Sequence, residues 1–281
     1  MLRSIHSAIS NEKRYDLSHK SKKMSAKCDT PISVPYGIIN MAILRFIVDR
    51  VRKVRKESKV RKERKVIMAH KSITMDASGF VLLSDYVPQI IQEIRYHSTY
   101  NFIGDRVDGY EEPIALLTKE AARALKDVSN ELFVKGYRLK IFDAYRPVRA
   151  VKHFILWGIE DQDVRMKEYF YPDLVKQELF NRGYIAKLSS HSRGSAVDLT
   201  LLNMKTGKEI DMGSPFDLFS EKSHPDYRGV TDEQYENRMF LQSAMKRNGF
   251  LPLECEWWHF TLEDEPYPDT YFEFPVAKDS L

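Results

Sequence analysis

The sequence predicts an α+β fold: a small, mainly antiparallel sheet with flanking helices, preceded by a basic N-terminal extension. Helical and strand patterns alternate along residues 76–281, but the strand patterns are short and linked by turns, which favours a small antiparallel sheet. The chain is 43% apolar and contains 15 Phe, 15 Tyr and 3 Trp, enough to fill a core. Charge is divided unevenly, with a net +13 over residues 1–75 and −9 over the rest.

The start of the chain carries no recognisable chemistry. Residues 1–35 are polar and without periodicity, so we expect them to be disordered. No apolar core of a signal peptide follows Met1. The apolar stretch Ile38–Val48 is eleven residues long, whereas a membrane-spanning helix needs about twenty. These features predict a cytoplasmic protein.

The basic segment Arg50–Val66 contains ten Lys or Arg among seventeen residues. It predicts either a basic amphipathic helix that rests on anionic lipid or nucleic acid, or a solvated, fraying helix. A true start codon at Met68 or Met75 would remove the segment altogether. We expect no specific nucleic-acid partner and at most a weak contact with anionic surfaces through residues 50–66.

The first elements of the folded part are marked by caps and alternation. Residues 80–83 are expected to form a strand or turn, residues 90–94 a further short element, and residues 96–110 a loop. Thr118 caps a helix that ends near Lys135 before Gly136. Alternating apolar residues predict a strand over 138–144. The following Pro147 can open a helix over 148–157.

The second half continues in the same way. A helix is expected over 173–181 before Gly183, and an apolar strand over 196–202. Thr231 and Gln234 form a capping-box pattern for a helix that runs to about Asn248. An aromatic run predicts a strand over 256–262, which we expect to be the last. The residues after Asp264 carry no prediction.

Two motifs carry the chemistry. His191 lies on an expected loop, Asp198 opens the strand over 196–202, and Glu256 precedes His259 by three residues in the last expected strand. A catalytic zinc takes three protein ligands from such nitrogen and oxygen donors and keeps one position open. His191, Asp198 and His259 could therefore hold a zinc ion, with Glu256 as the base for the attacking water. In a regular strand Glu256 would point away from His259, so the backbone has to bend or bulge there.

The two motifs together resemble a known family. The pattern S-x-H-x-x-G-x-A-x-D over 189–198 and the pattern E-x-W-H over 256–259 resemble the zinc D-Ala-D-Ala peptidases, and within them the D-alanyl-D-alanine dipeptidases of the VanX type. Further matching segments are Asp143–Pro147, Met212–Asp217, and Tyr96 with Asn101–Gly104. The resemblance covers about residues 76–277, so residues 76–281 are expected to form the dipeptidase domain.

The resemblance also implies roles for eight residues and one Zn²⁺ per chain. The implied metal ligands are His191, Asp198 and His259. Glu256 and Arg146 are implied as catalytic residues, since a guanidinium cannot be deprotonated and suits an oxygen that gains negative charge. Arg146 could instead be a structural partner of Asp143. The residues implied to contact the substrate are Tyr96, Ser189 and Asp217. Of these, Asp217 is the implied anchor of the substrate amine.

The implied activity is hydrolysis of the free dipeptide D-Ala-D-Ala, in cell-wall precursor metabolism or in resistance to glycopeptide antibiotics. One alternative is a peptidoglycan D,D-carboxypeptidase or endopeptidase of the same superfamily. The other is a non-catalytic, zinc-stabilised binding module, which the presence of both Glu256 and Arg146 argues against. Two cysteines, Cys28 and Cys255, make no disulfide framework. The oligomeric state is left open by the sequence.

Overall fold

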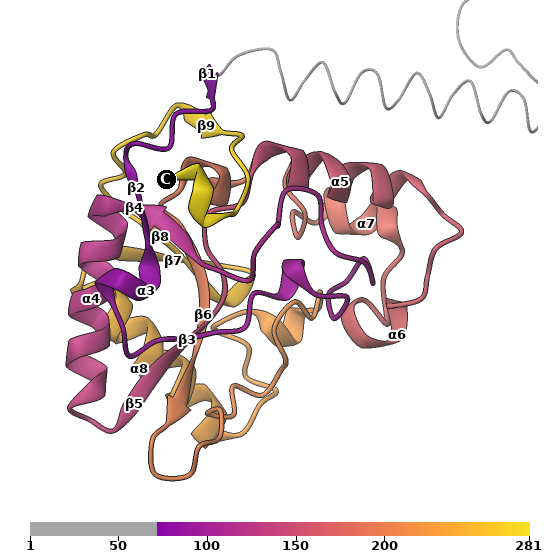
Figure 1. Ribbon diagram of the computed structural model, residues 1–281. Helices are drawn as coiled ribbons and strands as arrows, with labels where there is room; N and C mark the ends of the chain where they lie inside the picture. The colour runs from indigo at the N-terminus through magenta and orange to yellow at the C-terminus, as the bar shows by residue number, and fades with distance from the viewer. Residues whose placement is uncertain (1–71) are drawn as a thin grey trace, which may run out of the picture. The chain divides into compact units, whose positions relative to one another are not determined.

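The computed structural model describes residues 72–281, and the expectations for residues 1–71 fall outside that range. Its centre is a five-stranded sheet in the order β3-β5-β6-β8-β7 (Figure 1). Its strands are β3 (Ile91–Gln92), β5 (Tyr137–Asp143), β6 (Ala196–Asn203), β7 (Phe250–Leu253) and β8 (Glu256–Leu262). Within this sheet β3 and β5 run parallel, and the other three neighbouring pairs are antiparallel. The predicted α+β fold is thereby confirmed.

Two pairs of short strands lie outside the central sheet. β2 (Phe80–Leu82) pairs antiparallel with β4 (Leu116–Thr118), and β1 (Ser72–Thr74) pairs in parallel with β9 (Thr270–Phe272). The expectation that residues 256–262 form the last strand is therefore wrong. β9 has three residues, and the Ser72 hydroxyl donates to that of Thr270 across a separation of 198 residues. Such a strand has no local pattern that a sequence could reveal.

The longer helices begin at the residues expected from their caps, with one exception. The helices are α3 (Leu83–Tyr86), α4 (Lys119–Phe133), α5 (Val148–Ile159), α6 (Lys167–Phe170), α7 (Lys176–Asn181) and α8 (Asp232–Arg247). The Thr118 hydroxyl accepts from the backbone N–H of Ala121 at the start of α4. Helix α7 begins at Lys176 rather than near Asp173, because Val175 is extended and its N–H donates to the Glu178 carboxylate. Within residues 72–281 no helix is long and apolar enough to cross a membrane.

The helices are divided between the two sides of the sheet. Figure 1 shows α4 and α8 together on one side, with α5, α6 and α7 grouped on the other. On α4 the predicted apolar face, which includes Leu125 and Leu132, is completely buried, as are Leu139 of β5 and Leu199 of β6. Burying this much apolar surface against the sheet is the main source of its stability. Helix α4 therefore packs against one side of the sheet.

Candidate active site

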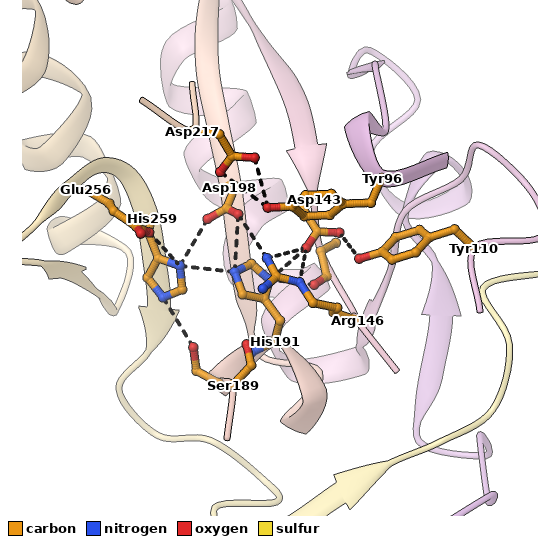
Figure 2. A network of polar contacts seen from close by, with 12 residues as sticks. Tyr96, Tyr110, Asp143, Arg146, Ser189, His191, Asp198, Asp217, Glu256 and His259 are labelled. Atoms are coloured by element: carbon orange, nitrogen blue, oxygen red, sulfur yellow. Dashed lines mark hydrogen bonds and ion pairs between the residues drawn. The ribbon is translucent and has the colours of Figure 1, made fainter. Parts of the chain in front are cut away.

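All eight residues expected to form the site line one pocket of about 540 Å³, part of which is open to solvent. They are Tyr96, Arg146, Ser189, His191, Asp198, Asp217, Glu256 and His259. They come from six separate stretches of the chain, and Figure 2 shows their polar atoms turned toward one another. The fold thus brings together every residue that the sequence singled out.

A row across three strands forms the floor of the site. The register of β5 against β6 shifts at Phe142, so that Asp143 lies opposite Asp198. On the other side of β6, Asp198 lies opposite His259 of β8. Directly opposed residues project from the same face of a sheet. The bulge in β5 therefore places Asp143, Asp198 and His259 side by side.

His191 reaches this row from η2 (Ser190–Arg193), a single 3-10 turn. The Ser189 hydroxyl begins the turn by accepting from the backbone N–H of His191. Gly194 ends it at a φ of +79°, and a Cβ at this position would lie 2.2 Å from the ring of Phe80. Both the backbone angle and the close approach require glycine. The positions of Ser189 and Gly194 on either side of His191 are thus set by the geometry of the turn.

Hydrogen bonds at the outer edges of both histidine rings direct their inner nitrogens to one point. His191 Nδ1 lies 2.6 Å from the carbonyl oxygen of Ala144, and because a carbonyl only accepts, Nδ1 carries the proton. His259 Nε2 lies 3.1 Å from the hydroxyl of Thr261 and 3.3 Å from that of Ser190. This leaves Nε2 of His191 and Nδ1 of His259 as the nitrogens that face Asp198.

These inner atoms form a donor set that fits a metal ion. His191 Nε2 lies 3.1 Å from His259 Nδ1 and 3.3 Å from Asp198 Oδ2, and His259 Nδ1 lies 3.0 Å from Asp198 Oδ1. All three side chains are buried, and their ligand atoms lie within 4.8 Å of one another. Burial, the largest effect, lowers the pKa of His259 and favours the neutral ring that binds metal. Two histidines and one carboxylate with an open side match the ligand chemistry of a catalytic Zn²⁺.

Glu256 reaches the site because of a second irregularity, in β8. Pro252 of β7 pairs with Phe260, but the next residue, Leu253, pairs with Glu256, so residues 257–259 have no partner in β7 and form a bulge on that side of β8. The bulge brings Glu256 Oε2 to 4.0 Å from His259 Nδ1. This is the bend that the three-residue spacing required.

The surroundings of Glu256 increase the affinity of its carboxylate for a proton. Burial and the negative charges of Asp198 and Asp217 raise the pKa of the Glu256 carboxyl well above its ordinary value, while Arg146 acts in the opposite direction. A carboxylate in this position can take up a proton readily.

Arg146 lies in the pocket and is also bonded to Asp143, as the structural alternative held. Its Nε donates to Asp143 Oδ2 at 2.9 Å, its Nη2 forms an ion pair with the same oxygen at 2.8 Å, and Nη2 lies 3.6 Å from Asp198 Oδ2. The guanidinium carbon is 4.8 Å from the ring centre of Tyr96 and 5.1 Å from that of Phe154. The two interpretations are compatible, because the bond to Asp143 fixes the plane of a guanidinium whose other edge faces the pocket.

Sequence reasoning missed Tyr110. Its hydroxyl donates to Asp143 Oδ1 at 2.6 Å, and both residues are almost completely buried. Tyr110, Asp143 and Arg146 thus form a continuous chain of hydrogen bonds, which Figure 2 shows at one end of the site. Asp143 could have been suspected from its place at the end of a strand, just before Arg146, but Tyr110 lies in a loop without any pattern.

Asp217 and Tyr96 form the opposite wall. The Tyr96 hydroxyl donates to Asp217 Oδ2 at 3.0 Å. Burial and the charge of Asp198 raise the pKa of Asp217 to about 8, while Arg146 and the bond from Tyr96 act to lower it. Asp217 has a φ of +61°, the one non-glycine residue with a positive φ among residues 72–281. Such a backbone costs of order 1–3 kcal/mol and is often found in functional sites.

Comparisons with known proteins agree with this arrangement. The family model described as D-ala-D-ala dipeptidase, of the M15 peptidases, matches residues 76–277. A D-alanyl-D-alanine dipeptidase of Enterococcus faecalis is 41% identical over 200 residues, which cover 71% of this chain and 99% of that protein. One of Enterococcus faecium is 41% identical, covering 70% and 98%, and one of Streptomyces coelicolor is 42% identical, covering 68% and 97%. By the extent of these matches, the chain belongs to the D-Ala-D-Ala dipeptidase family of M15 peptidases.

Proposed function

We propose that the protein is a zinc-dependent dipeptidase that hydrolyses free D-Ala-D-Ala to two molecules of D-alanine. The observation that carries the proposal is the convergence of His191, Asp198 and His259 in one pocket with Glu256 and Arg146. A ligand set, a base and a fixed cation are the groups that metal-assisted amide hydrolysis requires. Family membership supports the same activity.

His191, Asp198 and His259 are proposed to hold one Zn²⁺. When bound, the ion polarises the scissile carbonyl and makes water a better nucleophile at neutral pH. Glu256 takes the proton from the attacking water and passes it to the leaving amine. Its buried surroundings, which raise its pKa, suit a group that must hold that proton between the two steps.

Arg146 is proposed to face the carbonyl oxygen that gains negative charge. Asp143 accepts from its Nε and forms an ion pair with its Nη2, so the guanidinium is held in place before the substrate arrives. Donors fixed in advance stabilise a developing charge without having to reorganise.

Asp217 is proposed to bind the ammonium of the dipeptide. Tyr96 holds the carboxylate of Asp217 by its hydrogen bond, and Ser189 is proposed to contact the substrate nearby. A buried carboxylate in the pocket favours a substrate that supplies a compensating positive charge. This favours a short substrate with a free amino terminus.

We further propose that residues 76–281 form the dipeptidase domain and that residues 1–75 are an extension without a catalytic part. The weak contact of residues 50–66 with anionic surfaces and the cytoplasmic location belong to the same proposal. Because the family match begins at residue 76, residues 1–75 lie outside the part that the relatives share.

The test is a set of four substrates given to the zinc-loaded protein: free D-Ala-D-Ala, its N-acetyl form, L-Ala-L-Ala, and a pentapeptide that ends in D-Ala-D-Ala. Released alanine is measured for each. Acetylation removes the positive charge that Asp217 would bind, and hydrogen bonds to charged groups contribute about 1.5–3 kcal/mol, with more lost when a buried partner is left unpaired. We therefore expect the free dipeptide to be preferred by about 100-fold or more in kcat/KM.

Two other outcomes would favour the alternative functions. If the pentapeptide is cleaved as fast as the dipeptide, the protein is a carboxypeptidase. If the zinc-loaded protein cleaves none of the four substrates, it is a binding module.

A further inference from the structure

We propose that Trp257, Ser214 and Ser223 are positioning residues that hold Asp217 in place and so set the preference for substrates with a free amine. The inference rests on the proposed dipeptidase function and assigns the residues that give it its specificity. The three side chains link β8, which carries Glu256, to the loop over 214–223 that carries Asp217.

The side chains of Trp257, Ser214 and Ser223 form one chain of hydrogen bonds, in which each group donates to the next. Trp257 Nε1 donates to Ser214 Oγ at 2.9 Å, Ser214 Oγ lies 3.2 Å from Ser223 Oγ, and Ser223 Oγ donates to the carbonyl oxygen of Leu218 at 2.6 Å. An indole N–H only donates and a carbonyl only accepts. Since Ser223 uses its proton on Leu218, Ser214 must donate to Ser223. Every proton in the chain is therefore placed.

The chain fixes the backbone on both sides of Asp217. Ser214 is three residues before it and Leu218 directly follows it. Between them Asp217 adopts a φ of +61°, which residues with a side chain rarely take up unless the neighbouring structure holds them there. Phe216 adds a second anchor, because its ring stacks on Phe142 with ring centres 4.6 Å apart. Without the chain the loop could relax and withdraw the carboxylate from the pocket.

The positioning residues do not touch the substrate pocket themselves. Asp217 and Glu256 line that pocket, whereas Trp257 and Ser214 line a different cavity, and Ser223 is completely buried. Trp257 directly follows Glu256. This series of hydrogen bonds therefore sets the spacing between the proposed base and the proposed amine anchor. A substitution here should change how the amine is bound and leave the chemical step largely intact.

The experiment compares kcat and KM for free and N-acetylated D-Ala-D-Ala in the zinc-loaded full-length protein. For Ser214→Ala and for Trp257→Phe, we expect the preference for the free dipeptide to fall from about 100-fold to about tenfold. The loss should appear as a higher KM for the free dipeptide, with kcat within about threefold and the N-acetyl form little affected. The ratio of two substrates does not depend on how much of the preparation is folded, so partial unfolding cannot mimic this result.

Three further variants make the test specific. Ser220→Ala removes a hydroxyl from the same loop that accepts only from the Lys222 N–H, and it should leave the ratio unchanged. Ser214→Thr keeps the hydroxyl that Ser214→Ala removes, so it should keep the preference for the free dipeptide. In the Asp217→Asn background Ser214→Ala should have no further effect on the ratio, since both changes act on one interaction.

The two proposals fail in different ways. If the unaltered protein does not cleave D-Ala-D-Ala, the proposed function is wrong. If it cleaves the dipeptide with the expected preference while Ser214→Ala and Trp257→Phe keep that preference, the positioning role is overturned. The positioning role is equally overturned if Ser214→Ala and Ser220→Ala lower the ratio by the same factor.

Discussion

Replacing Tyr110 by Phe tests the hydrogen bonds behind Arg146. The substitution removes one hydroxyl, which donates to Asp143 Oδ1 at 2.6 Å where both residues are almost completely buried. Arg146 contacts the other oxygen, Oδ2, through a hydrogen bond from Nε and an ion pair with Nη2, so it does not donate to Oδ1. One oxygen of a buried carboxylate would then lose the donor that Tyr110 supplies.

A second buried tyrosine provides the control. Tyr145 is as deeply buried as Tyr110, and its hydroxyl donates at 2.8 Å to the backbone carbonyl of Phe274, which is uncharged. Hydrogen bonds to charged groups contribute about 1.5–3 kcal/mol and neutral ones about 0.5–1.5 kcal/mol. We therefore expect Tyr110→Phe to lower the free energy of unfolding by about 2–3 kcal/mol and Tyr145→Phe by about 1 kcal/mol.

Urea unfolding at one saturating zinc concentration measures both losses, because bound metal itself adds to stability and must be held constant. In a thermal melt the same values correspond to Tm decreases of about 4–12 °C and about 2–4 °C for a domain of this size. Only Tyr110→Phe should also lower kcat, by about tenfold, since it loosens a donor to the developing charge. Equal losses of stability in the two variants would refute the reasoning, because they would show that the charge on Asp143 does not strengthen its bond to Tyr110.

Three more predictions concern the metal, the base and the extension. His259→Ala should lower bound zinc, measured by atomic absorption, together with turnover, as a chelator should in the unaltered protein; full zinc occupancy in the variant would remove His259 from the ligand set. Glu256→Gln should keep the metal and the fold but lose about 10²- to 10⁴-fold in kcat, and near-normal turnover would place the base elsewhere. Deleting residues 1–71 leaves the pairing of β1 with β9 intact and should keep kcat/KM within about threefold, whereas a truncated protein that fails to fold would show that the extension supports the domain.

Local chemistry explains why the helices could be predicted. Thr118 before α4 and the Thr231–Gln234 pair before α8 satisfy backbone N–H groups within three residues, so the signal and the structure lie in the same short stretch. Where the signal was weaker, as at the start of α7, the boundary was misplaced by a few residues. The turn that carries His191 was equally visible, because Ser189 and Gly194 follow from its local geometry.

The sequence by itself supplied the candidate site residues and their order along the chain. Only the tertiary structure decided that they meet. The bulge at Phe142 places Asp143 opposite Asp198, and the bulge at residues 257–259 turns Glu256 toward His259. A bulge is a property of the pairing between two strands, so a pattern within one strand does not announce it. For the first bulge the two strands, β5 and β6, are also far apart in sequence. The same reason hides the bond from Tyr110 to Asp143, which exists because burial brings a loop against the end of a strand.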